Sequence, residues 1–228
     1  MLLESRDLSV GYRGKPLFEA LRMDVDFGEV LVVTGRNGSG KSSLLRCLAG
    51  QQRPLAGAVT LEGEPADDRQ PRFRRSVAAL LDGGAWYPNL TAAEHLSFVQ
   101  LVNAPMPDGW FTAADLAAAL ALDGFANTVP GQLSSGQRQR LAVAMALARP
   151  SRLLLLDEPE RHLDEPGRDG VGRLVTEYAD RGGAVVLVTH DASLAAGPGR
   201  RTLALDRDAG AGPAGTSEQR TRPRGGAR

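Results

Sequence analysis

One segment of the chain combines the residue types needed to bind a phosphate group. It matches the pattern G-x-x-x-x-G-K-[ST] and runs through Gly35, Arg36, Asn37, Gly38, Ser39, Gly40, Lys41 and Ser42, with Ser43 directly after it. Glycines let the backbone curl until successive N–H groups point at phosphate oxygens, and the N-terminus of a following helix adds partial positive charge. We therefore predict nucleotide binding, with Lys41 at the β- and γ-phosphates and the Ser42 hydroxyl on Mg²⁺. The alternative is an ordinary glycine-rich turn, but one of only two lysines in the chain falls on the required position.

Two carboxylates follow the apolar run Leu153–Leu156. A buried strand of this kind would carry Asp157 to its carboxyl end, where open α/β sheets bind their ligands. Asp157 can hold Mg²⁺ there, and Glu158 can polarise a water that attacks the γ-phosphate. A strand followed by a solvated acidic turn is the alternative for this segment taken alone.

A histidine follows a second apolar run. His190 comes directly after Val185–Thr189. A lone histidine after a strand is more often structural or exposed than functional, so its interpretation depends on the motifs around it.

The segment that runs from Leu133 to Gln137 and into a predicted helix separates this chain from kinases, GTPases and helicases, which share the first two motifs. It reads LSSGQ and resembles the LSGGQ signature of the ABC (ATP-binding cassette) ATPase family. With that match, the glycine loop resembles the family's Walker A motif and Leu153–Glu158 its Walker B motif. The segment Glu158–Asp164 resembles the D-loop, and His190 resembles the switch histidine.

The resemblance spans roughly residues 3–206, in the family's motif order and spacing. It implies ATP and Mg²⁺ as cofactors, and it places Tyr12 where the family carries an aromatic that stacks on adenine. An ordinary tyrosine of a β-sheet is the alternative for Tyr12.

The resemblance also implies that two chains share each nucleotide. The signature residues that this would bring to the ATP of the opposite subunit are Ser134, Ser135, Gly136 and Gln137. Asp164 of the D-loop is a further predicted nucleotide-binding residue. We therefore expect a homodimer or heterodimer of ATPase subunits that works with a separate transmembrane permease, and no specific nucleic acid partner.

The chain departs from the family pattern at three places. Asp82 stands where the family carries the Q-loop glutamine, and a carboxylate there can still approach Mg²⁺. Ser135 replaces the first glycine of the signature, a change that Ser134 and Gly136 on either side should tolerate. Arg161 and His162 replace small residues of the D-loop, where contact with a partner subunit and simple solvation are equally plausible.

The pattern of apolar residues predicts the elements that position these motifs. Short buried strands alternate with helices after residue 29, which indicates a mostly parallel sheet covered on both faces. We expect an α/β fold with a P-loop NTPase (RecA-like) core, an N-terminal antiparallel β subdomain with a turn at Gly11–Pro16, and a helical lobe inserted at about 83–149. Helices are predicted at 41–50, 91–102, 112–122, 135–148 and 167–180, and strands at 29–34, 58–62, 76–81, 153–156 and 184–188.

The amino-acid composition limits the kinds of protein and partner that this chain can be expected to have. A 42% hydrophobic chain with 27 basic and 27 acidic residues supports a real core and no general attraction to nucleic acid. The single cysteine, Cys47, lies in an apolar helical run, which indicates a buried structural thiol, and His95 is expected on a helix surface. We expect one domain over 1–206 and a disordered tail over 207–228. No signal peptide or membrane span is evident, so we expect a cytoplasmic protein peripheral to the inner face of the membrane.

Two functions remain open at this stage. The first is the ATP-hydrolysing subunit of an ABC transporter, similar in its compact length to bacterial export subunits. The second is a soluble ABC ATPase that acts on ribosomes, DNA or Fe–S assembly. A degenerate cassette is disfavoured because Glu158 and His190 are both present.

The substitution Asp82→Gln tests the departure at the Q-loop position. Restoring the family's amide removes a negative charge that would repel the carboxylates of Asp157 and Glu158. We expect steady-state ATPase assays to show activity that is retained or raised. Complete loss of turnover would instead show that Asp82 has a role of its own.

Overall fold

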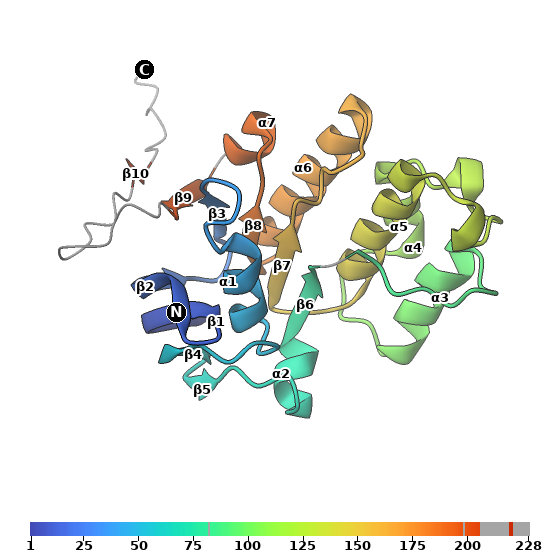
Figure 1. Ribbon diagram of the computed structural model, residues 1–228. Helices are drawn as coiled ribbons and strands as arrows, with labels where there is room; N and C mark the ends of the chain where they lie inside the picture. The colour runs from blue at the N-terminus through green and yellow to red at the C-terminus, as the bar shows by residue number, and fades with distance from the viewer. Residues whose placement is uncertain (82, 198, 206–218, 221–228) are drawn as a thin grey trace, which may run out of the picture.

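The computed structural model describes residues 1–81, 83–197 and 199–205, and the backbone of Gln219 and Arg220. Within these residues the chain forms two β-sheets, with helices packed on them and a helical lobe to one side (Figure 1). The predicted α/β core, antiparallel N-terminal sheet and inserted helical lobe are confirmed.

The larger sheet has six strands in the order β10-β9-β3-β8-β7-β6. The five strands from β9 to β6 are mutually parallel, and only β10 pairs antiparallel with its neighbour. Its strands are β3 (Val30–Thr34), β6 (Val77–Leu80), β7 (Leu153–Asp157), β8 (Ala184–Val188), β9 (Arg200–Ala204) and β10 (Gln219–Arg220). The central strands are continuous apolar runs because both of their faces are buried.

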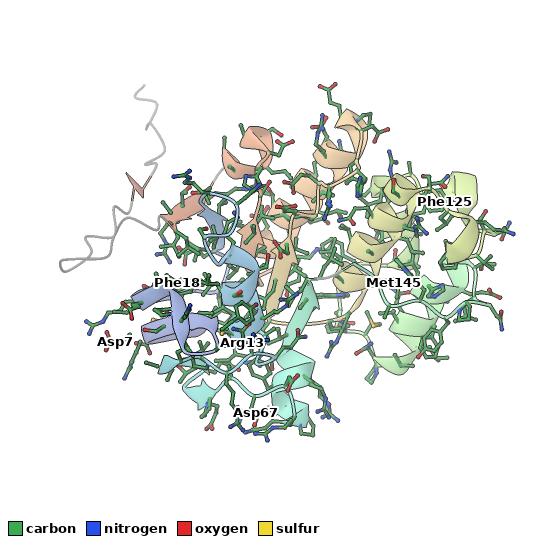
Figure 2. All side chains as sticks on the ribbon, viewed as in Figure 1. Asp7, Arg13, Phe18, Asp67, Phe125 and Met145 are labelled. Carbon is green, nitrogen blue, oxygen red and sulfur yellow. The ribbon has the colours of Figure 1, made fainter. Side chains whose placement is uncertain are left out.

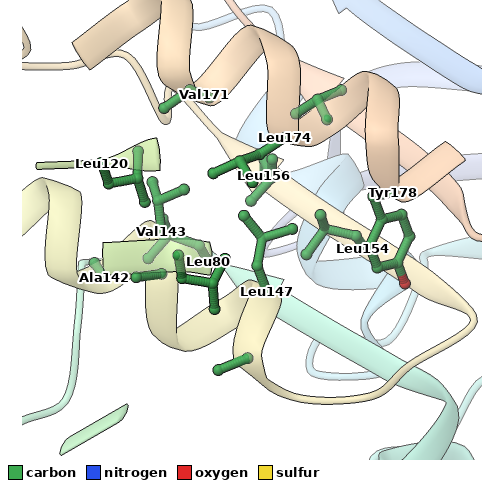
Figure 3. Packing of buried hydrophobic residues seen from close by; sticks show 14 of the residues in the cluster. Leu80, Leu120, Ala142, Val143, Leu147, Leu154, Leu156, Val171, Leu174 and Tyr178 are labelled. Carbon is green, nitrogen blue, oxygen red and sulfur yellow. The ribbon is translucent and has the colours of Figure 1, made fainter. Parts of the chain in front are cut away.

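Successive residues of each central strand enter two different cores. Leu154 and Leu156 pack with helices α5 (Ser135–Ala148) and α6 (Glu165–Asp180), as Figure 3 shows. Leu153 and Leu155 point the other way and join the cluster that contains α1 (Lys41–Leu48) and the antiparallel sheet. This alternation follows from the two-residue period of a strand.

The smaller sheet is antiparallel, with the order β2-β1-β4-β5. Its strands are β1 (Leu3–Tyr12), β2 (Lys15–Val25), β4 (Ala56–Leu61) and β5 (Glu64–Pro65). The predicted turn between the first two strands is tighter than expected, because Tyr12 already pairs with Lys15. Only Arg13 and Gly14 form the turn, and both have a positive φ, of 51° and 75°. Arg13 is labelled in Figure 2.

The helical lobe connects β6 to β7, which are adjacent parallel strands. It contains α3 (Ala92–Val102), α4 (Ala113–Ala119), two short 3₁₀ turns (Asp123–Phe125 and Pro130–Gln132) and α5. Phe125 and Met145 mark its position in Figure 2. Because a parallel neighbour needs a long crossover, a lobe fits here without disturbing the sheet.

Each helix of the lobe begins with a capping box. At α3 the Thr91 hydroxyl accepts from the Glu94 N–H while the Glu94 carboxylate accepts from the Thr91 N–H. The helix predicted to reach Leu122 ends at Ala119 instead. The Leu122 N–H turns back to the Ala117 carbonyl, and Ala121 takes a φ of 50°, so the chain leaves the helix through a left-handed residue.

The expectation that His95 lies on a helix surface is wrong. Its side chain is completely buried, its Nε2 accepts from the Tyr87 backbone N–H at 3.0 Å, and its Nδ1 lies 2.8 Å from the Thr91 carbonyl oxygen. The imidazole packs edge-on against Trp86. His95 therefore attaches the segment before α3 to the lobe. Helix periodicity could not predict this, because the partners of the imidazole lie outside the helix pattern.

The remaining elements are short. Helix α2 (Pro71–Ser76) leads into β6, and α7 (Ala192–Ala195) follows the loop that contains His190. Of the predicted tail 207–228, only β10 is described, so the prediction of disorder there stays a prediction.

The buried thiol of α1 provides a test of the packing. Cys47 is 2% exposed, and burial raises the pKa of its thiol from 9.0 to about 11. At neutral pH that shift leaves about 100-fold less thiolate than an unperturbed cysteine would have. We expect a maleimide reagent to label native protein at pH 7.5 at least that much more slowly than protein in concentrated guanidinium. Equal labelling rates in the two states would contradict the buried position.

Candidate nucleotide site

The glycine loop joins the end of β3 to the start of α1, as predicted. Gly35 has a φ of 145° and Gly40 a φ of 105°, values that residues with a side chain rarely adopt. A Cβ on Gly35 would lie 2.4 Å from the Leu205 carbonyl oxygen, and one on Gly40 would lie 3.0 Å from the Phe18 ring. The two glycines are therefore required by backbone conformation and by space together.

Two side chains of the loop are turned into it. Lys41 is buried, and its ammonium group donates to the carbonyl oxygens of Gly35 at 2.8 Å and Arg36 at 3.1 Å. The Ser39 hydroxyl is also buried and has no hydrogen-bond partner among the described residues. A buried, unsatisfied hydroxyl in a loop that leads into the N-terminus of a helix fits an oxygen-rich ligand such as a phosphate. Arg36, Asn37, Gly38 and Ser42 lie on the exposed side of the loop.

Tyr12 lies beside this loop at the end of β1. Its hydroxyl lies 2.9 Å from the Ser43 hydroxyl, and about half of its side-chain surface is exposed. The structure thus brings Tyr12 and Ser43 together next to the phosphate loop, with the tyrosine ring available on the surface.

Asp157 ends β7 and faces the start of α1. Burial raises the pKa of the Asp157 carboxyl and the neighbouring Glu158 adds to the rise, while a hydrogen bond from Ser42 lowers it. A half-buried carboxylate and a hydroxyl held together supply the oxygen ligands that Mg²⁺ prefers, and a cation would relieve the cost of burying the charge. No group of three or more His, Cys, Asp or Glu side chains that could hold a metal ion is found in the described part of the chain.

Glu158 and His190 follow the ends of neighbouring strands. The Glu158 N–H donates to the Val188 carbonyl, and Glu158 takes a left-handed φ of 47°. The His190 Nε2 lies 3.5 Å from a Glu158 carboxylate oxygen. Non-glycine residues with such strain cluster at functional sites, because the surrounding structure must hold them there.

The signature segment forms the first turn of α5. Ser134 is the N-cap, and it forms a capping box with Gln137. A Cβ on Gly136 would lie 2.8 Å from the His162 carbonyl oxygen, so the helix packs directly on the D-loop backbone. Ser135 is exposed, and Asp164 caps α6 through the Gly167 N–H at 3.1 Å and forms an ion pair with Arg140.

A cavity of about 460 Å³ lies at the carboxyl edge of the sheet. It is lined by Ser42, Arg46, Leu80, Leu81, Gly83, Gln139, Asp157, Glu158, Arg161 and His162. The cavity brings together Ser42 and Asp157, two of the three residues predicted to bind Mg²⁺, and Glu158, which is predicted to polarise water. Arg161 and His162 are on its wall, whereas Ser134–Gln137 are not among its lining residues. Asp82 falls outside the described residues.

Three residues of this region were missed by the sequence interpretation. Arg46 lies four residues after Ser42 and also lines the cavity. This spacing places the two residues on one face of α1 and is a sequence signal for Arg46. The Gln139 amide donates to the Pro159 carbonyl oxygen at 3.0 Å, which ties α5 to the segment after Glu158.

Glu160 is the third. One of its carboxylate oxygens accepts from the Thr189 hydroxyl at 2.6 Å and from the His190 N–H at 3.1 Å. Its other oxygen is buried and has no partner in the described residues. Glu160 thus connects the D-loop to the loop that carries His190, over a sequence distance that no local pattern spans.

The fold and this cavity together define a class of protein. A parallel strand that runs through a glycine loop into a helix, in the same sheet as a strand ending in carboxylates, is the architecture of P-loop nucleotide hydrolases. The family model described as "ABC transporter" matches residues 18–161, more than half of the chain. The chain belongs to this family and is an ABC ATPase.

Relatives and solved structures agree with this assignment. The cytochrome c biogenesis ATP-binding export protein CcmA of Shewanella frigidimarina is 33% identical over 207 residues, which cover 90% of this chain and 94% of CcmA. The putrescine transport ATP-binding protein PotG of Escherichia coli is 34% identical over 192 residues, which cover 83% of this chain but only 51% of PotG. The chain therefore spans about half the length of PotG.

Two solved structures superpose on most of the chain. One is an ATP binding subunit of an ABC transporter, with a TM-score of 0.79 and 26% identity, covering 91% of this chain and 87% of that one. The other is a dimeric ATP-binding cassette in a post-hydrolysis state bound to ADP and Pi, with a TM-score of 0.76 and 26% identity, covering 90% of this chain and 95% of that one.

The contacts of Glu160 generate a prediction. Glu160→Ala removes the acceptor that holds Thr189 and the His190 N–H, so the His190 side chain loses its fixed position beside Glu158. The sequence predicts that His190 and Glu158 act in hydrolysis, and small displacements of such groups are costly. We therefore expect kcat for ATP to fall by about 10-fold or more, with little change in KM. Glu160→Gln keeps an acceptor oxygen and should retain most of the activity. An alanine variant that is folded and fully active would contradict this role.

Proposed function

We propose that this chain is the ATP-hydrolysing subunit of a transporter and that it drives a separate transmembrane permease by pairing on ATP with a second ATPase subunit. The proposal rests on one observation, which is that the signature segment does not line the cavity that contains the other predicted nucleotide-binding residues. The phosphate loop and the carboxylates Asp157 and Glu158 meet at one edge of the sheet, while Ser134–Gln137 of the same chain do not line that cavity. The N-terminus of α5 is therefore free to serve a nucleotide held by another subunit.

In this proposal the glycine loop binds the phosphates of ATP. Its N–H groups and the start of α1 face the phosphate oxygens, and Lys41 exchanges its two carbonyl partners for the β- and γ-phosphates. The ring of Tyr12 stacks on adenine, a contact that contributes roughly 1–3 kcal/mol by analogy with other base–aromatic pairs.

Mg²⁺ would be held by Ser42 and Asp157, with Asp82 as the additional ligand that we proposed from the sequence. When bound, the ion neutralises negative charge on the β- and γ-phosphates. Its charge also offsets the burial that raises the pKa of Asp157. Magnesium binding should accordingly weaken as the pH falls through that raised pKa, since only the carboxylate is a ligand.

Glu158 would act as the base that orients and polarises the attacking water. His190, whose Nε2 lies 3.5 Å from the Glu158 carboxylate, would help to position the groups around the γ-phosphate. Across the dimer, Ser134 and the backbone at Ser135, Gly136 and Gln137 would contact the same phosphate from the partner, with Asp164 nearby. Hydrolysis removes the γ-phosphate contacts and so releases the pair.

We propose that the permease binds in a groove between the sheet and the lobe. A cavity of about 460 Å³ lies between β6, α3 and α5, and Val99, Val102 and Met145 line it with apolar surface. Val102 is 60% exposed and the neighbouring Leu101 74%. Every helix among the described residues is too short or too polar to traverse a bilayer. We therefore propose a peripheral position on the inner face of the membrane, held by this partner.

The second candidate is an ABC ATPase that acts away from membranes, on ribosomes, DNA or Fe–S assembly. The exposed apolar groove favours a protein partner rather than a nucleic acid. A neighbouring gene for a multi-span membrane protein, or co-purification with one, distinguishes the two.

The substitution Glu158→Gln tests the proposed mechanism. It removes the base and its charge while keeping the shape, so hydrolysis should fall by about 10²–10⁴-fold. ATP should then accumulate in a stable dimer that size-exclusion chromatography with light scattering detects. Glu19→Gln, at an exposed glutamate of β2, is the matched control and should behave as wild type. Turnover at the wild-type rate in Glu158→Gln would exclude Glu158 as the base.

A further inference from the structure

A second large cavity lies between α6, α7 and the start of β9, and it shares no lining residue with the nucleotide cavity. Its volume is about 500 Å³. Residues at its base and wall include Arg168, Gly172, Thr176, Ser193, Gly197 and Arg200. None of these residues belongs to the motifs described above, so the nucleotide site does not account for the cavity.

Arg200 lies in this cavity with its charge unpaired. It is 7% exposed, and its Nη2 donates to the Gly172 carbonyl at 3.2 Å and the Thr176 hydroxyl at 3.4 Å. Its Nε and Nη1 are buried and have no partner among the described residues, and no carboxylate there forms an ion pair with it. Gly197 packs against the guanidinium so closely that a Cβ would lie 2.4 Å from it.

Arg201, the next residue of the same strand, is also buried, but its guanidinium has carboxylate partners. Arg201 is 8% exposed, and its Nε donates to the Glu29 carboxylate at 2.6 Å while its Nη2 lies 3.5 Å from an Asp24 carboxylate oxygen. Burial of a cation without such partners is expensive. Burial lowers the pKa of Arg200, which reflects the same cost.

The rim of the cavity limits what could enter. Arg168 pairs with Asp191, Glu177 pairs with Arg181, and the exposed Arg173 is offset by Asp169 and Asp180 nearby on α6. With the two ion pairs set aside, one cation faces two carboxylates, so the rim carries a net charge of about −1. The buried positive charge that has no ion-pair partner in the described chain is the one at the base. This arrangement suits a small oxyanion and disfavours a polyanion, which the rim carboxylates would repel.

We propose that this cavity binds the carboxylate or phosphate group of a small molecule, with the Arg200 guanidinium as its principal donor. The bound oxygens would satisfy the orphaned N–H groups and supply the missing counter-charge. Thr176 and Gly172 hold the guanidinium in place for this contact.

Thermal unfolding of the full chain tests the proposal, with sodium acetate and sodium phosphate as separate probes and sodium chloride at matched ionic strength as the reference. Wild-type protein should gain about 2–4 °C at saturating concentrations of at least one probe. The gain should disappear in Arg200→Met. Acetate and phosphate are compared because the first reports a carboxylate site and the second a phosphate site.

The matched control is Arg201→Met, at the neighbouring buried arginine. In chloride, Arg200→Met should be as stable as wild type or more so, because it removes an unpaired buried charge. Arg201→Met should be clearly less stable, because it leaves Glu29 without its cation, and yet it should keep the anion-dependent gain. A gain that persists in Arg200→Met would place anion binding elsewhere, for instance at the phosphate loop, and would overturn the proposal. No gain with either probe, or destabilisation by Arg200→Met as large as that by Arg201→Met, would overturn it as well.

Discussion

Parallel strands that end at one edge of one sheet are the constraint on which the nucleotide site depends. β3, β8 and β7 lie side by side in register, so that Val33 and Asp157 both align with Val188. Strands that share a direction also share a carboxyl edge, and the glycine loop, the two carboxylates and His190 therefore emerge together although they are far apart in sequence. Reversing any one of these strands would remove its residues from the site. The burial of the strands on both faces, by two separate apolar clusters, is what holds that common edge in place.

The edge concentrates groups that a folded protein does not usually tolerate. The carboxyl of Asp157 is buried enough to raise its pKa, the Ser39 hydroxyl has no partner in the described structure, and Glu158 takes a left-handed backbone conformation. Each feature costs stability by itself, and each becomes favourable when phosphate oxygens and a cation are present. These features lower the stability of the protein without its ligand. They are the features expected of a site that binds a highly charged ligand.

The helical lobe is joined to this edge by contacts of α5. Gly136 packs on the His162 carbonyl, the Gln139 amide donates to the Pro159 carbonyl, and Arg140 forms an ion pair with Asp164. The same helix carries the signature at its N-terminus. A displacement of α5 would change the backbone contacts of the segment that follows Glu158, so a partner that moves the lobe can affect hydrolysis through packed atoms.

The sequence by itself determined the architecture and the position of each nucleotide motif, because both are written in local patterns. Apolar runs predicted β7 and β8, the glycine spacing predicted the loop before α1, and the apolar pattern predicted the helix that the structure shows as α3. Only the tertiary structure decided which distant groups meet. His95 is buried because Tyr87 supplies its donor, and Glu160 matters because it contacts Thr189 and His190. Arg200 is unusual because no carboxylate of the described chain forms an ion pair with it. Local periodicity reports which face of an element is apolar, whereas pairing between polar groups depends on three-dimensional packing that no short window of sequence contains.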